Sequence, residues 1–213
     1  MSIQTERPAS KLQLGLMWSR MKKASRLDTQ GVLELKTDTT ATGQAVGVLV
    51  LAALSSGVGN AVFTQLQHPN ITITSIIVGS LANMISACFA AFVWSATVFL
   101  VGTKLFQGRT RYWELARPLF FSTSPFILLI LISIPIPSMI VLWKINIPSV
   151  ITFGTLHINW IPGTVAIVAS VWIVVSQVFA LKQVMGFDIR RTMLTVAVGL
   201  LILAFIELQF GTG

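Results

Sequence analysis

The sequence predicts an all-helical integral membrane protein, a polytopic bundle of five transmembrane helices with its N-terminus in the cytoplasm and its C-terminus outside. Of the 213 residues, 54% are hydrophobic and only 10% are charged, a composition typical of membrane proteins. The chain also contains five apolar stretches, each close to the ~20 residues that cross ~30 Å of hydrocarbon. These stretches are residues 45–63, 84–102, 119–138, 163–181 and 192–210.

The positions of the basic residues orient this bundle. All of the 15 Lys and Arg residues except Lys144 lie before the first stretch, between the second and third, or between the fourth and fifth. Cytoplasmic loops carry the excess of Lys and Arg, so these three segments are predicted to be cytoplasmic. The net charge of +8 then faces anionic lipid head groups, and nucleic acid is not expected as a partner.

Residues 1–44 form a predicted cytoplasmic N-terminal region, and residues 45–213 form the transmembrane domain. The polar residues ahead of the first stretch argue against a cleavable signal peptide. Within 10–27 an apolar stripe that includes Trp18 recurs at helical spacing, which predicts an amphipathic helix. Its stripe would enter the cytoplasmic leaflet or lie on the protein's own bundle, with a partner protein as the alternative. The cations that would contact lipid or a partner are Arg20, Lys22, Lys23 and Arg26.

The first stretch carries small residues on one face, a pattern that lets a second helix approach closely. The predicted packing positions are Ala52, Ser56, Gly57, Gly59 and Asn60. The second apolar run, from 73 to 106, is too long for one upright crossing and predicts a strong tilt or a segment along the outer interface. Trp94 and Trp172 fall near the middle of their helices and are predicted to face the bundle.

The third stretch contains Pro125, which predicts a kink that makes this residue a further packing position. The outer connection that follows, 137–162, is rich in β-prone residues. The cytoplasmic connection before the third stretch combines cations with Tyr112 and Trp113, and we expect it to contact lipid or a partner, with a purely topological role as the alternative. The predicted contact residues in the two later cytoplasmic connections are Arg109, Arg111, Trp113, Arg117, Arg190 and Arg191.

Catalysis is not expected. Within the five stretches the only ionisable acidic or basic side chain is Glu207, near the outer end of the last one, and ionisable groups inside a membrane usually mark function. Zinc-protease, serine-hydrolase and phosphate-binding motifs are absent from the sequence. His68 and His157 both belong to the outer side and are weak candidates for a shared metal, haem or pigment site. No cofactor is predicted.

The order of these elements resembles the Yip family of five-span membrane proteins, and in particular its prokaryotic members. The residues that carry the resemblance are RMKKASRLDTQ, KTDTTATGQAVGVLVLAALSSGVG, FLVGTKLFQGRTRYWELARPLFFSTSP and ALKQVMGFDIRRTMLTVAVGLL. The resemblance implies a cytosolic N-terminus, a multi-pass protein of a prokaryotic cytoplasmic membrane and a non-enzymatic role in membrane organisation or trafficking. The Asp-Leu-Tyr-Gly-Pro signature of eukaryotic relatives is missing, which argues against Rab GTPase binding.

Three functions are compatible with these features. The first is a non-catalytic scaffold or accessory subunit of a larger membrane assembly, for example an energy-transducing complex, in which other integral membrane proteins are the partners. The second is a transporter or channel for a small neutral or lipid-like solute, with a polar cavity that would be lined by Asn60, Ser122, Ser124, Ser170 and Gln177. The third is a trafficking or membrane-organisation factor of Yip type.

Overall fold

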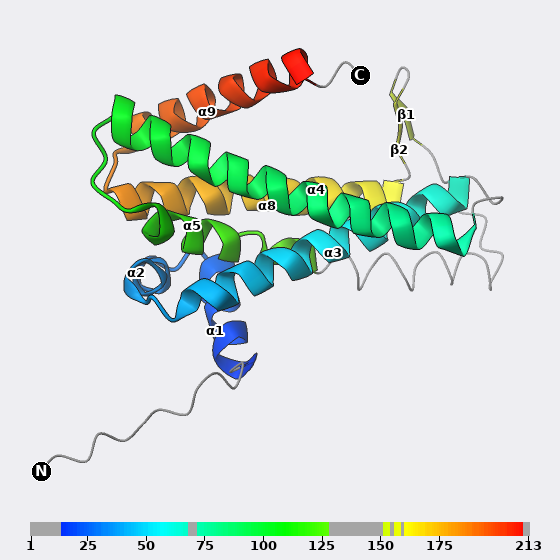
Figure 1. Ribbon diagram of the computed structural model, residues 1–213, viewed down its shortest axis with the longest axis horizontal. Helices are drawn as coiled ribbons and strands as arrows, with labels where there is room; N and C mark the ends of the chain where they lie inside the picture. Colours follow the sequence, from blue (N-terminus) through cyan, green and yellow to red (C-terminus); the bar gives the residue numbers. More distant parts are fainter. Residues whose placement is uncertain (1–13, 68–71, 128–150, 154–155, 159, 211–213) are drawn as a thin grey trace, which may run out of the picture.

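The computed structural model describes residues 14–67, 72–127, 151–153, 156–158 and 160–210, with side chains for 14–59, 72–127 and 167–205. Within these residues the fold is helical apart from one short hairpin (Figure 1). The helices are α1 (Leu14–Ser25), α2 (Thr29–Thr37), α3 (Ala41–Gln67), α4 (Ile73–Leu100), the π-helical turn η1 (Val101–Leu105), α5 (Tyr112–Phe121), the 3-10 turn η2 (Ser124–Phe126), α8 (Trp160–Met185) and α9 (Ile189–Phe210). The strands are β1 (Ile151–Phe153) and β2 (Leu156–Ile158).

Three of the described helices are long and apolar enough to cross a membrane. The candidate spans are Ala41–Gly59, Ile73–Leu105 and Ile167–Met185. The second span confirms that the run from 73 to 106 is longer than one upright crossing, and it forms a single helix that ends in a π-helical turn. Five crossings and their orientation stay a prediction, because residues 128–138 of the third stretch lie outside the described part of the chain.

The third predicted stretch begins differently from the sequence-based expectation. Helix α5 starts at Tyr112 and ends at Phe121, and η2 follows with Pro125 in its first turn. Proline has no amide hydrogen and clashes with the preceding turn of an α-helix, so it fits the start of a new turn and not a helix interior. The predicted kink is therefore a break in the helix. Within the β-prone connection 137–162, the described residues confirm a strand pair, in which Ile151 pairs with Ile158 in an antiparallel register.

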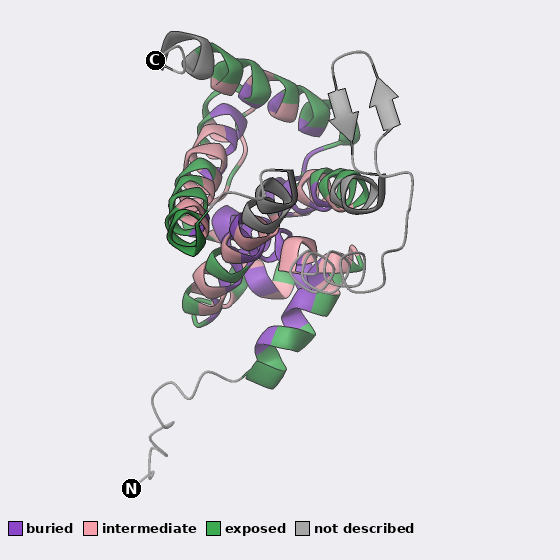
Figure 2. Cartoon of the chain, turned by 90° about the vertical axis from the view of Figure 1, so that its right-hand side faces the viewer, coloured by how far each residue is buried: buried purple, intermediate pink, exposed green. Residues whose placement is uncertain are grey.

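The helices α3, α4 and α8 lie along the long axis of the molecule, while α9 runs away from them toward the C-terminus (Figure 1). Helix α5 contacts α1, α2, α3, α4 and α8, and all seven of its residues from Leu115 to Phe121 are buried. Figure 2 shows buried residues on the sides of the helices that face one another and exposed residues on the outer sides. Helix α5 is therefore the centre of the packing at one end of the bundle.

Two clusters of buried side chains meet on α5. One joins α1, α3 and α5 and includes Met17, Met21, Val48, Phe120 and Phe121. The other joins α2, α4, α5 and α8 and includes Val32, Val98, Leu115, Leu181 and Val184. The two N-terminal helices are thus part of the same packed core as the candidate spans.

Candidate functional site

An arginine on α1 is buried among the helices at the basic end of the bundle. The side chain of Arg20 is only 4% exposed. Its Nη1 donates to Oε1 of Gln44 on α3 at 2.6 Å, and its Nη2 forms an ion pair with Asp38, which lies between α2 and α3. A buried charge is stable only when it is paired and hydrogen-bonded. Arg20 therefore holds α1 against the start of α3.

A second buried arginine, Arg117 on α5, holds the end of α2. Its Nη1 donates to the backbone oxygens of Leu35, Lys36 and Asp38 at 3.2, 2.8 and 3.1 Å. The last carbonyl groups of a helix have no partner within the helix and carry the negative end of its dipole. A guanidinium group satisfies both needs at once. We call Arg20, Asp38, Gln44 and Arg117 the arginine lock.

Asp38 joins the two halves of the lock, because its carboxylate pairs with Arg20 and its backbone oxygen accepts from Arg117. Burial raises the pKa of Asp38. Hydrogen bonds from the side chain and backbone of Thr40 and the charges of both arginines lower this pKa by more, so the net pKa is below its ordinary value. The carboxylate is thus kept ionised at neutral pH. This charged form is the one that the arginine lock requires.

Further contacts tie the N-terminal helices to α8. Lys36 donates from Nζ to the backbone oxygen of Val184 at 2.7 Å, at the carboxyl end of α8. The indole nitrogen of Trp172 donates to the backbone oxygen of Ser25 at 3.0 Å. Trp172 is 43% exposed, so its indole N–H has the predicted partner within the bundle while much of its ring lies on the surface. Trp94 does face the bundle, and its indole nitrogen donates to Gln177 at 2.9 Å.

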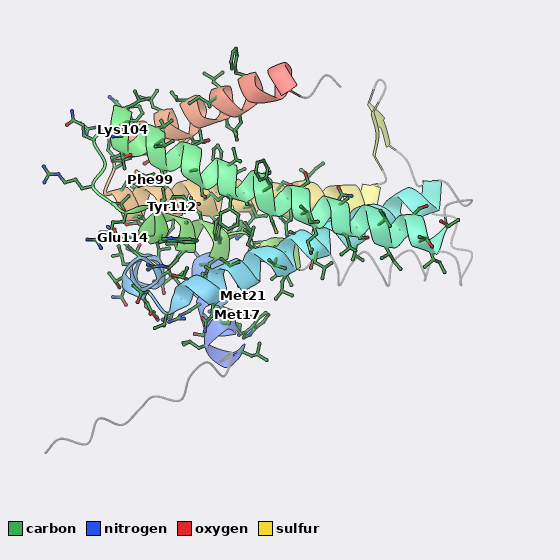
Figure 3. All side chains as sticks on the ribbon, viewed as in Figure 1. Met17, Met21, Phe99, Lys104, Tyr112 and Glu114 are labelled. Atoms are coloured by element: carbon green, nitrogen blue, oxygen red, sulfur yellow. The ribbon has the colours of Figure 1, made fainter. Side chains whose placement is uncertain are left out.

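The structure corrects the predicted surface role of Arg20 and Arg117. Both were expected to contact lipid or a partner, but both are buried and bonded within the fold. The apolar stripe of α1 lies on the protein's own bundle only in part, because Met17 and Met21 are buried there whereas Trp18 is 54% exposed. Figure 3 shows Met17 and Met21 between α1 and α3. The partners Asp38 and Gln44 were not predicted as site residues.

Most other predicted contact cations lie on the surface of the same end. The exposed cations are Lys22, Arg26, Lys104, Arg109, Arg111, Arg190 and Arg191. Lys22 lies over the ring of Trp18, with 5.6 Å from Nζ to the ring centroid. Lys23 pairs with Glu34 at 2.6 Å, and Arg191 with Asp188 at 4.0 Å. Among the described residues, no ion pair forms with Arg109, Arg111 or Arg190.

Aromatic contacts fix the position of the exposed Trp113 beside these cations. The hydroxyl of Tyr112 lies 2.8 Å from the hydroxyl of Ser95, and its ring packs edge-on against Phe99 and Trp113. The carboxylate of Glu114 accepts from the backbone N–H of Arg111 at 3.1 Å. Figure 3 shows Phe99, Lys104, Tyr112 and Glu114 together at this end of the molecule. The surface of Arg109, Arg111, Trp113 and Arg190 is called the basic rim.

The predicted small-residue face of α3 packs against α4. A Cβ atom at Gly57 would lie 2.6 Å from the backbone oxygen of Ser80, so the two backbones approach too closely for a side chain. Ala52 is buried, and Ser56 and Gly59 are half-buried. The side chain of Asn60 lies outside the described residues. The close partner of this face is therefore a helix of the same chain.

The residues predicted for a polar transport cavity do not converge among the side chains that the structure describes. The hydroxyl of Ser122 donates to the backbone oxygen of Leu119, Ser124 bonds Ser25, and Ser170 is exposed. Gln177 lines a cavity of about 50 Å³ between α4, α5, α8 and α9. His68 and the side chain of His157 lie outside the described residues, within which no cluster of three His, Cys, Asp or Glu side chains could hold a metal.

Comparison with known proteins identifies one family. The family model of the Yip1 domain matches residues 30–208, which include α2 and the candidate spans. No curated protein and no solved structure matches the chain. Yip1 proteins are generally non-catalytic membrane proteins, and this chain is a multi-pass membrane protein. The resemblance seen in the sequence is thereby confirmed, and the chain belongs to the Yip1 domain family.

Proposed function

We propose that this Yip1-domain protein is a non-catalytic scaffold or accessory subunit of a larger membrane assembly. The observation that carries the proposal is the division of its basic residues into two sets. Arg20 and Arg117 are buried and bonded within the arginine lock, whereas Arg109, Arg111 and Arg190 remain exposed. The fold thus holds a set of cations at fixed positions without using them for its own stability.

The basic rim suits contact with anionic lipid head groups and with acidic surfaces of other integral membrane proteins. Arginine binds carboxylates and phosphates in a two-pronged geometry, and tryptophan beside it adds apolar area at low entropic cost. Trp113 is 41% exposed next to Arg111. Because Tyr112 and Glu114 fix the start of α5, little ordering energy is lost on binding.

The orientation that we propose is five crossings with the basic rim in the cytoplasm of a prokaryotic-type cell and the C-terminus outside. Support comes from the basic segments, because α2, residues 106–111 and the connection between α8 and α9 lie at one end of the molecule, with α1 beneath that end (Figure 1). The positive-inside rule assigns such an end to the cytoplasm. The missing Asp-Leu-Tyr-Gly-Pro signature supports a role other than Rab GTPase binding.

Native-gel migration with mass spectrometry tests the proposed function after gentle detergent extraction from the source membrane. We expect co-migration with a larger complex at fixed stoichiometry, and dissociation in the variant Arg109→Gln with Arg111→Gln. The matched control is Arg7→Gln with Lys11→Gln, which removes two cations that precede α1 in the sequence and should leave the complex intact. Migration of the unaltered protein as a free monomer would overturn the scaffold proposal.

A further inference from the structure

Helix α9 meets the bundle tightly at its start and then separates from it. Thr192 and Thr195 are fully buried, and a Cβ atom at Gly199 would lie 3.3 Å from both Trp94 and Val98 of α4. Beyond this point Leu200 is 55% and Leu201 70% exposed, and Figure 1 shows α9 leaving α4 and α8. The helices therefore enclose a wedge whose narrow end lies near Gly199.

An apolar cavity of about 50 Å³ occupies the narrow end of this wedge. Side chains from α4, α5, α8 and α9 line it, among them Trp94, Val98, Leu119, Leu181, Val196 and Leu200. The indole N–H of Trp94 is already bonded to Gln177, so this donor is not available to a ligand. The cavity therefore suits a hydrocarbon group and not a polar solute.

Two cations lie near the ends of α8 and α9 that the short connection joins. Lys182 is one helical turn beyond Val178, on the same face of α8, and Arg190 is the second residue of α9. A short connection with Gly186 at φ +67° joins the two helices, which brings these cations to one end. Arg190 and Leu200 are ten residues apart, about 15 Å along a helix, which is half of the ~30 Å hydrocarbon thickness.

We propose that the groove between α8 and α9 binds one anionic phospholipid of the cytoplasmic leaflet. Lys182 and Arg190 bind its phosphate, and one acyl chain fills the cavity beside Trp94 and Gln177. Basic pockets between transmembrane helices on the cytoplasmic side are suited to such head groups. A second copy of this chain fits less well, because it carries a net charge of +8 and would place like charges at the cationic end. The inference rests on the proposed orientation.

The test for the head-group end is lipid titration followed by native mass spectrometry of the full chain in detergent micelles, with phosphatidylglycerol and phosphatidylcholine as probes. We expect one tightly bound phosphatidylglycerol molecule and weaker binding of phosphatidylcholine. Lys182→Gln with Arg190→Gln should lower the affinity for phosphatidylglycerol about 25-fold, since each cation contributes about a factor of five. Arg7→Gln with Lys11→Gln is the matched control and should leave this affinity unchanged.

A second pair of variants tests the cavity. Val196→Phe fills the cavity and should lower the affinity for phosphatidylglycerol about tenfold, because about two methylene groups of the acyl chain are displaced. Leu201→Phe adds the same ring at an exposed position of α9 and should have no effect. Circular dichroism and elution volume establish that each variant is folded.

Two results would overturn the lipid site. One is equal binding of both lipids in all variants, and the other is a loss of affinity in the charge variant without any loss in Val196→Phe, which would indicate surface attraction alone. These results are independent of the proposed scaffold function, because lipid binding is measured on the purified chain. Either of these two results, together with co-migration in a larger complex on native gels, would overturn the lipid site and leave the scaffold proposal standing.

Discussion

Arg117 donates to the backbone oxygen of Asp38 at 3.1 Å although the two residues are 79 positions apart in the chain. Through this bond the central helix α5 fixes the linker between α2 and α3. The carboxylate of Asp38 in turn pairs with Arg20 on α1. One acidic residue thus connects two N-terminal helices, the first candidate span and the centre of the bundle.

Replacing Arg117 should destabilise the protein strongly. In Arg117→Ala the backbone oxygens of Leu35, Lys36 and Asp38 lose their shared donor while they remain largely shielded from water. We expect a loss of about 3 kcal/mol in the free energy of unfolding. Arg117→Lys keeps the charge but not the planar donor group, and should lose about 1–2 kcal/mol. Thermal or denaturant unfolding in detergent measures both.

The exposed Arg109 offers the matched control for this prediction. Arg109→Ala removes the same kind of side chain from the surface and should change the free energy of unfolding by less than about 0.5 kcal/mol. Equal losses for Arg109→Ala and Arg117→Ala would show that Arg117 does not support the fold as described.

Arg20 and Asp38 should be energetically coupled. Arg20→Gln and Asp38→Asn each remove one charge and leave the other without its partner. The double variant should therefore lose less stability than the sum of the losses in the two single variants. We expect a coupling energy of about 1–3 kcal/mol in a double-mutant cycle. Additive losses would mean that the ion pair contributes nothing beyond its separate members.

The free energy of unfolding should depend on pH only at acidic pH, below about pH 4. Burial raises the pKa of Asp38, yet its hydrogen bonds and the two arginines bring the net pKa below its ordinary value. The pKa of Glu114 is also lowered, mainly because its carboxylate accepts a hydrogen bond from the backbone N–H of Arg111. A lowered pKa in the folded state adds stability that is complete above the unfolded pKa of about 4 and is lost as the pH falls through the folded value.

Unfolding midpoints at pH 7, 5 and 3 measure this dependence. We expect little change between pH 7 and 5 and a fall below about pH 4. The variant Asp38→Asn with Glu114→Gln should show a smaller fall, since it has lost both titrating groups. An identical fall in the variant would assign the acid sensitivity to other carboxylates.

Gly57 and Gly47 should respond in opposite directions to the same substitution. Gly57→Ala places a Cβ 2.6 Å from the backbone oxygen of Ser80 and forces α3 and α4 apart, which should cost about 2 kcal/mol. Gly47 lies on the same helix with no heavy atom within 4 Å of an added Cβ. Gly47→Ala should therefore stabilise by about 0.5–1 kcal/mol. Equal effects on the unfolding midpoint would contradict the close approach of α3 and α4.

Much of the helical framework could be predicted from the sequence, because apolar runs and the charges that bound them are local signals. The small-residue face around Gly57 and the bonded indole of Trp94 also follow from local composition. Helix ends were less predictable. Helix α5 begins at Tyr112, outside any apolar stretch. Glu114 caps its first turn and the surrounding helices bury its later residues, and these contacts stabilise the helix although its first residues are polar.

The arginine lock could not be predicted, because it depends on contacts across 18 to 82 positions of the chain. Arg20 and Arg117 look like other basic residues of the cytoplasmic segments. One signal was present in hindsight: Arg117 is followed by Pro118 and then by apolar residues, whereas the exposed Arg109 and Arg111 have polar neighbours. A cation inside an apolar turn must have buried partners.

The proposed orientation predicts opposite locations for the two ends of the bundle. A reporter enzyme that is active only outside the cytoplasm should be active when fused after residue 213 and inactive when inserted after Arg109, since five crossings separate the N-terminus from the C-terminus and the second basic segment is cytoplasmic. Removing the exposed charges Arg109, Arg111, Arg190 and Arg191 together should weaken this asymmetry, because they supply much of the cytoplasmic excess of cations. Removing Lys144 is the control and should leave it unchanged. Activity at both fusion sites in the unaltered protein would require an even number of crossings between them, and would place the basic rim outside the cell.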